Sequence, residues 1–228
     1  MDSSPSKASQ PVARRSERLR FRLVPRPKAL QPQCCLPSRP VEPLCVPPYT
    51  SGMSDYRRYF VPGGSYFFTI NLLERRNNRM LVTHIDALRE AVRKTTQERP
   101  FRIDGWVVLP EHMHLMMTLP PNDTDFSNRI KAIKIRFNRS IPAIERRSDV
   151  RSAKGERGIW QRRFWEHAIR DDRDFEKHLD YLHFNPVKHG HVARVQDWPY
   201  STFHRWVERG VYSMDWAGGD VTDVEIGE

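Results

Sequence analysis

Residues 109–119 read LPEHMHLMMTL, an apolar run that contains two histidines. Such a run is typical of a buried β-strand, in which residues i and i+2 point to the same face of the sheet. His112 and His114 therefore lean the same way, close enough together to hold one metal ion. Met113, between them, points toward the core. Two histidines at the edge of a core strand would have the same spacing, so the pair alone leaves both roles open.

A second stretch, residues 178–186, reads HLDYLHFNP and predicts a helix. His178, Tyr181 and Asn185 fall on one stripe of that helix, at positions i, i+3 and i+7. Tyr181 and Asn185 are one turn apart, so the phenol oxygen and the amide oxygen can reach a common ion. For Tyr181 taken alone, the alternative is a half-buried tyrosine whose hydroxyl bonds to backbone.

The periodicity around these stretches predicts alternating strands and helices. We expect strands at 66–73, 101–109, 112–119 and within 160–169, and helices at 83–97 (with Thr83 as N-cap), 124–139 and from Asp171 or Asp172 to Pro186. This order is an α+β layout. A ferredoxin-like antiparallel sheet with helices on one face fits it best.

Composition divides the chain into three parts. Residues 1–52 are rich in Pro, Ser and Arg without a sustained period, which predicts a disordered basic extension. Residues 53–211 carry the periodic segments and are expected to form the folded domain. Residues 212–228 contain acidic residues but no Lys or Arg, and we expect an acidic C-terminal tail.

The charge balance indicates an anionic partner. The net charge is +10 and the pI is about 9.8, which favours nucleic acid first and an anionic membrane surface second. No apolar run approaches the roughly 20 residues of a membrane helix, and the N-terminus lacks the apolar core of a signal peptide. We therefore expect a cytoplasmic, DNA-associated protein without a membrane partner.

Histidines, an amide and a tyrosine together suit chemistry at a phosphate. A phenol is a weak nucleophile when protonated, and a nearby cation favours the phenolate. A divalent ion also polarises a phosphoryl oxygen. Two histidines and an amide oxygen leave coordination positions open, as in a catalytic site. Such mixed ligands suit Mg²⁺ or Mn²⁺, and Zn²⁺ at least as well.

These residues resemble those of a known family. A His-hydrophobic-His strand, followed by a helix with Tyr and then Asn four residues later, is similar to the HUH single-tyrosine transposases. The longer resemblance is to the REP-associated tyrosine transposases, over roughly residues 53–217. It rests on the segments YRR (56–58), YFFT (66–69), PEHMH (110–114), WQRRFWEH (160–167), YLHFNPVKHG (181–190) and WPYSTFHR (198–205).

The resemblance implies a metal-dependent endonuclease and strand transferase of single-stranded DNA that acts at palindromic hairpin repeats. It implies that Tyr181 forms a covalent 5′-phosphotyrosine and that His112, His114 and Asn185 bind Mg²⁺ or Mn²⁺. Related enzymes work as homodimers or as monomers. Basic residues near these segments are candidates for DNA contact: Arg162, Arg163, Lys188, His189, Lys131 and Lys134.

Two other functions remain open from the residues alone. The first is a hairpin-DNA-binding protein without catalytic activity. The second is a zinc-dependent hydrolase that uses His112 and His114 with water as the nucleophile. A covalent adduct that disappears in Tyr181→Phe separates the transposase from both.

Overall fold

The computed structural model describes residues 58–143, 145, 153 and 157–218. The expected extension at 1–52 and the last part of the acidic tail, 219–228, lie outside the described residues. The described chain forms, in order, β1 (Ser65–Asn71), α1 (Met80–Thr83), α2 (Ile85–Glu98), β2 (Arg102–Val108), β3 (His112–Thr118), α3 (Phe126–Ser140), β4 (Trp165–Ala168), α5 (Asp172–Lys188), a 3₁₀ turn η1 (Val195–Asp197) and α6 (Phe203–Glu208).

The strands form one antiparallel sheet in the order β2-β3-β1-β4. With α2 between β1 and β2, and α3 between β3 and β4, this is the ferredoxin-like arrangement that the sequence predicts. The register pairs Asn71 with His112 and Thr69 with His114. Both histidines therefore lie on one of the two central strands of the sheet, β3, and face residues of the other, β1.

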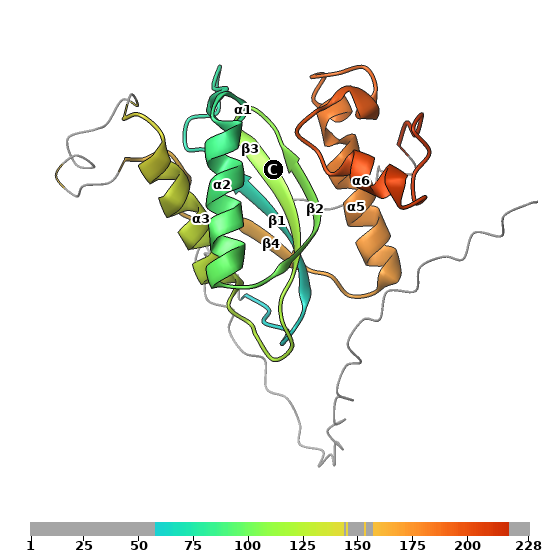
Figure 1. Cartoon of the computed structure of the whole chain (residues 1–228), viewed down its shortest axis with the longest axis horizontal. Coiled ribbons are helices and arrows are strands. Elements are labelled where there is room, and N and C mark those ends of the chain that lie inside the picture. Colours follow the sequence, from blue (N-terminus) through green and yellow to red (C-terminus); the bar gives the residue numbers. More distant parts are fainter. Residues whose placement is uncertain (1–57, 144, 146–152, 154–156, 219–228) are drawn as a thin grey trace, which may run out of the picture.

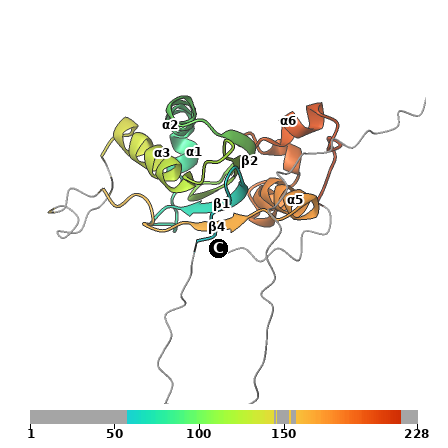
Figure 2. The same cartoon turned by 90° about the horizontal axis from the view of Figure 1, so that it is seen from below.

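Helices cover both faces of the sheet (Figures 1 and 2). One core lies under α2 and α3 and takes alternate residues of β3, namely Met113, Leu115 and Met117. The second core lies under α5 and α6 and includes Phe67, Met116 and Leu179. The expectation of helices on one face holds for α2 and α3 and is wrong for α5. The reason is that each of three strands also buries an apolar residue on the other face, namely Phe67 of β1, Val107 of β2 and Met116 of β3.

Close packing brings α5 onto the sheet at Gly105. A Cβ atom at this position would lie 2.8 Å from Cδ1 of Leu179 and 3.2 Å from Cδ1 of Leu182. Gly105 also lies where the β2–β3 register shifts, as glycines in strands often do. The absent side chain therefore lets α5 approach the sheet closely.

The helix ends agree in part with those that the sequence predicts. Asp125 and Asp171 are N-caps whose carboxylates accept the backbone N–H of Asn128 and Asp174, as Asp residues commonly do. Thr83 is not a cap. It ends α1, and α2 begins after His84, which makes no capping side-chain bond.

Helix α5 runs further than the sequence predicts. We expected it to end at Pro186, but α5 continues through this proline to Lys188. The backbone N–H groups of His189 and Gly190 bond to the carbonyls of Asn185 and Val187 and hold the last turn. Proline removes one backbone hydrogen bond, and its ring crowds the carbonyl of the preceding turn. Pro186 lies two residues before the end of α5, so only the last turn has to accommodate it.

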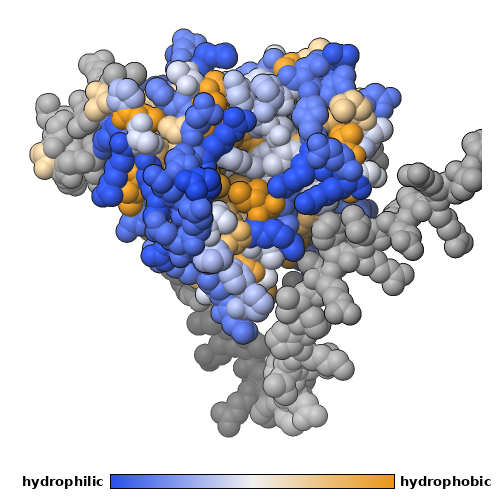
Figure 3. Space-filling view, in the orientation of Figure 1, coloured by the Kyte–Doolittle hydropathy of each residue, from blue (hydrophilic) through white to orange (hydrophobic). Residues whose placement is uncertain are grey.

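The surface in Figure 3 is polar over α2, with apolar side chains between α2 and the α5–α6 layer. Within the described ranges, every helix is too short or too polar to cross a bilayer.

Candidate active site

The two histidines of β3 point toward the α5 layer. His112 and His114 are both fully buried, and their ring centroids are 5.0 Å apart. Phe67 on β1 stacks on His114 at 5.3 Å between ring centroids. The shared face that strand periodicity predicts is confirmed.

A different neighbour orients each histidine ring. Nδ1 of His112 lies 3.0 Å from a carboxylate oxygen of Glu111, and Nδ1 of His114 lies 3.1 Å from Oγ1 of Thr69. Partners on Nδ1 present the other ring nitrogen, Nε2, as the ligand atom, which is the usual support for a metal-binding histidine. Nε2 of His112 is buried and has no hydrogen-bond partner among the described residues. A buried nitrogen of this kind suits a metal ion.

Charge around Glu111 keeps its carboxylate ionised. Partial burial raises the pKa of Glu111, but the hydrogen bond and charge of His112, with the guanidinium of Arg75, outweigh burial and lower the pKa overall. The Arg75 guanidinium lies 3.6 Å from the same carboxylate oxygen. Glu111 is thus a fixed acceptor for the Nδ1 proton of His112.

The packing of α5 brings Tyr181 to the histidines. Its side chain is buried, and its ring lies 5.6 Å from the His114 ring and 6.2 Å from that of Phe67. Asn185 follows one turn later and is fully buried. The structure therefore places Tyr181, His112 and His114 together, with Asn185 on the adjacent turn.

Two basic residues at the end of α5 also lie at this site. Lys188 donates a hydrogen bond from Nζ to the Tyr181 hydroxyl oxygen at 2.9 Å. His189 lies with its ring 5.3 Å from that of His112. Both contacts depend on the continuation of α5 past Pro186.

The comparisons with known proteins agree with this site. Residues 65–185 match the family model of IS200-like transposases. A REP-associated tyrosine transposase from Escherichia coli strain K12 is 52% identical over 77% of this chain and 98% of its own length. This chain belongs to the REP-associated tyrosine transposases.

A second relative, described as a REP-associated tyrosine transposase from Haemophilus influenzae, is 48% identical over 73% of this chain and 94% of its own length. A solved structure of a REP-associated tyrosine transposase bound to a REP hairpin is 51% identical. It superposes with a TM-score of 0.66 over 77% of this chain and 98% of that one. The ferredoxin-like fold, the transposase family and the enzymatic class expected from the sequence are confirmed.

The other residues predicted to contact DNA in this transposase do not lie near Tyr181. Arg162 and Arg163 are exposed in the segment that precedes β4. Lys131 and Lys134 lie on α3, which packs against the opposite face of the sheet. Lys134 donates to the carbonyl of Gln161 and lies over the rings of Trp160 and Phe164. Burial there lowers the pKa of Lys134 to about 8.

Activity in this family depends on a metal ion. Besides His112 and His114, a second group of side chains could hold such an ion. Ligand atoms of His167, Asp174 and His178 lie within 4.8 Å of one another. However, Asp174 already accepts hydrogen bonds from His167 and from the Arg170 backbone and side chain. Nδ1 of His178 bonds to the Asp174 carbonyl at 2.8 Å, so that nitrogen carries a proton. These bonds link β4 to α5, and they leave Nε2 of His178, which is buried without a hydrogen-bond partner among the described residues, as the ring nitrogen that could take an ion.

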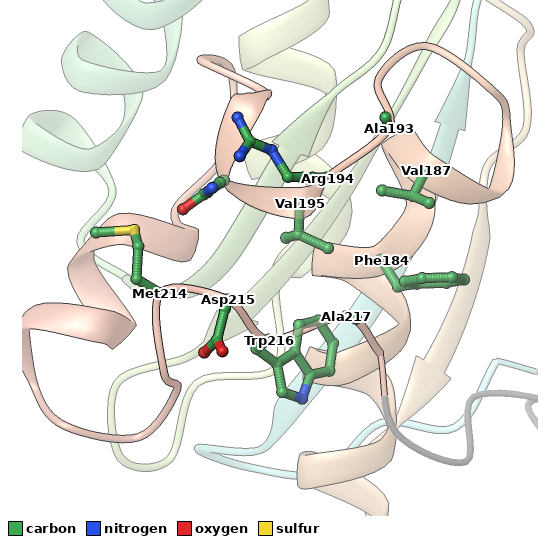
Figure 4. Close-up of a pocket in the computed structure, with 10 residues that line it drawn as sticks. Phe184, Val187, Ala193, Arg194, Val195, Met214, Asp215, Trp216 and Ala217 are labelled. Atoms are coloured by element: carbon green, nitrogen blue, oxygen red, sulfur yellow. The ribbon is translucent and has the colours of Figure 1, made fainter.

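A cavity of about 170 Å³ lies beside the C-terminal half of α5 (Figure 4). Phe184 and Val187 of α5 line it on one side, and Met214 and Trp216 on the other. The lining of this cavity includes none of His112, His114 and Tyr181, so the candidate active site is a separate feature of the transposase.

Sequence reasoning missed the residues that orient the site. Thr69 lies 45 residues before His114 and meets it only through the β1–β3 register. Glu111 stands next to His112 in sequence. A carboxylate beside a candidate histidine ligand is a signal from which its orienting role could have been predicted. Phe67, which contacts both His114 and Tyr181, resembles any core aromatic in the sequence.

Proposed function

We propose that this chain cleaves and rejoins single-stranded DNA beside hairpin repeats, and that Tyr181 is its nucleophile. The observation that supports this role is the meeting of Tyr181 with the His112–His114 pair, although the two segments are far apart in sequence. The hairpin carried by the 51%-identical transposase structure supports the choice of DNA partner.

His112, His114 and Asn185 are the proposed ligands of a divalent ion, Mg²⁺ or Mn²⁺. The buried Nε2 of His112 fits this role, and an amide oxygen beside two imidazoles gives a nitrogen and oxygen set that such ions accept. When bound, the ion neutralises negative charge on the phosphate oxygens. Glu111 and Thr69 hold the two rings in place.

The proposed reaction transfers the phosphate between two oxygens. The Tyr181 hydroxyl loses its proton to water, and its oxygen attacks the scissile phosphorus. A bond from tyrosine to phosphorus forms, the bond to the 3′-oxygen breaks, and that oxygen takes a proton from water. The products are a 5′-phosphotyrosine and a 3′-hydroxyl. Attack by a 3′-hydroxyl on the phosphotyrosine reverses these steps and rejoins DNA.

Backbone contacts of the DNA are assigned to Arg162, Arg163, Lys188 and His189. Each lies in the segment before β4 or at the end of α5, and each carries or can carry positive charge. Phosphate contacts of this kind position DNA without reading its sequence. We propose a cytoplasmic enzyme that works on DNA as a monomer or homodimer.

A denaturing gel tests the proposal. The full chain is incubated with Mg²⁺ or Mn²⁺ and with labelled single-stranded DNA that carries a hairpin repeat from beside its own gene. We expect a labelled band that stays with the protein after denaturation and disappears in Tyr181→Phe and with EDTA. Tyr59→Phe is the matched control, because Tyr59 is exposed and lies before β1.

Other outcomes have distinct meanings. Cleavage without an adduct would indicate water as the nucleophile and a metal-dependent hydrolase. Hairpin binding with neither cleavage nor adduct would indicate a DNA-binding protein without catalytic activity. An adduct that persists in Tyr181→Phe would move the nucleophile to another residue.

A further inference from the structure

The end of α5 places a positive charge directly on the proposed nucleophile. Nζ of Lys188 lies 2.9 Å from the hydroxyl oxygen of Tyr181 and 4.7 Å from the centroid of its ring. The two residues are seven positions apart, which is two helical turns, so they share one face of α5. The contact is therefore built into the helix.

This contact requires the unusual course of the helix. If α5 ended at Pro186, Lys188 would leave the face that carries Tyr181. Instead, the bonds from the N–H groups of His189 and Gly190 keep residues 186–188 helical. The backbone of Lys188 is thereby fixed, although the residue is exposed. A lysine that is exposed and also bonds to the buried tyrosine oxygen can contact a phosphate that arrives from solvent.

We infer that Lys188 is a catalytic residue that stabilises the negative charge on the Tyr181 oxygen. This inference rests on the proposed nucleophile. An ammonium has three donor hydrogens and no lone pair, so Lys188 donates to the tyrosine oxygen and does not accept its proton. The proton goes to water, as in the scheme above. In the forward step Lys188 stabilises the attacking phenolate, and in the reverse step it stabilises the same phenolate as the leaving group.

A simpler role for Lys188 makes a different prediction. A lysine at a helix C-terminus interacts favourably with the helix dipole, and a lysine near DNA binds phosphate. Neither role requires contact with the tyrosine oxygen. A lysine that only binds phosphate changes DNA affinity and its salt dependence, whereas a catalytic lysine changes the rate of the bound complex.

Single-turnover formation of the covalent adduct, with protein in saturating excess over hairpin DNA, tests the inference. Lys188→Met keeps most of the length of the unbranched side chain and removes its charge. We expect the rate to fall about 100-fold, the usual effect of losing one donor to a developing oxyanion. Lys188→Arg keeps a charged donor and should recover part of the rate. Lys94→Met, on α2 beneath the other face, is the control and should retain the wild-type rate.

Two further measurements separate chemistry from binding and folding. Hairpin affinity is measured in a Tyr181→Phe background, where we expect Lys188→Met to weaken binding less than about 10-fold. Thermal unfolding checks that each variant is folded. In the reverse direction, isolated adduct supplied with a 3′-hydroxyl strand should also react about 100-fold more slowly in Lys188→Met.

The results distinguish this inference from the proposed function. If wild type forms an adduct on Tyr181 and Lys188→Met forms it at the same saturated rate, the role of Lys188 is overturned and the nucleophile stands. If wild type forms no adduct on Tyr181, the proposed function itself fails. A folded Lys188→Met variant whose rate returns to the wild-type value when the protein concentration is raised also overturns the inference, because Lys188 then only binds DNA.

Discussion

Thr69 and His114 face each other across the β1–β3 ladder, and Oγ1 of Thr69 lies 3.1 Å from Nδ1 of His114. Both side chains are fully buried. The hydroxyl fixes the rotation of the imidazole, and so decides where its other nitrogen points. A residue of β1 thereby controls the geometry of the proposed metal ligand on the neighbouring strand β3.

Replacement of this hydroxyl tests its part in metal binding. Thr69→Val keeps the branched shape and removes the partner of Nδ1, so we expect the affinity for Mn²⁺ to fall about 10- to 100-fold. Equilibrium dialysis measures this affinity. Thr96→Val removes a hydroxyl that bonds to the carbonyl of Val92 on α2 and should leave metal affinity unchanged. Equal affinities in wild type and Thr69→Val would contradict the role given to Thr69.

The two candidate metal sites are separated by one pair of variants. His112→Ala removes a proposed ligand and should reduce Mn²⁺ affinity more than about 100-fold, because the loss of a ligand exceeds that of an orienting neighbour. His178→Gln disrupts the His167–Asp174–His178 group, and we expect it to cost about 1–2 kcal/mol of stability while Mn²⁺ affinity stays unchanged. The reverse pattern would place the ion between β4 and α5.

The close contact between Gly105 and Leu179 determines how closely α5 packs on the sheet. Gly105→Val should destabilise the protein by about 1–3 kcal/mol, because the added atoms overlap the leucine. It should also slow adduct formation, since Tyr181 moves with the helix. Leu179→Ala makes room, so the double variant should be more stable than the two separate effects add up to. Urea unfolding measures the stability of the single and double variants. Strictly additive effects on stability would show that Gly105 and Leu179 do not interact.

Stability should depend on pH through His183. Burial, and next the charge of Arg205, lower the pKa of His183 to about 3. Between about pH 6.5 and pH 3 the unfolded chain binds a proton that the folded chain does not, so stability falls as the pH falls. From pH 7.5 to pH 5, the loss from this residue should be about 2 kcal/mol.

His183→Gln tests this dependence, because the amide nitrogen can still bond to Oγ1 of Thr202 as Nε2 does. Urea unfolding at both pH values should show a loss smaller by about 2 kcal/mol in this variant. His204→Gln replaces an exposed histidine of α6 and should keep the wild-type loss. If His183→Gln lost as much stability between pH 7.5 and pH 5 as wild type, His183 would be protonated in the folded chain at pH 5.

The sequence by itself determined the features that depend on neighbours along the chain. Strand periodicity put His112 and His114 on one face and Met113 on the other. Helical periodicity put Tyr181 and Asn185 on adjacent turns of α5. Such patterns are set by the fixed repeat of each element, so they hold wherever the element packs.

Only the tertiary structure decided which elements meet. The apolar residues of β1 alternate toward two cores, and no local pattern says that α5 covers the face with the histidines. Thr69 reaches His114 through the strand register, and Lys188 reaches Tyr181 because α5 passes through Pro186. A strand pairing and a helix end are chosen by the packing energy of the whole molecule, which a local pattern does not contain.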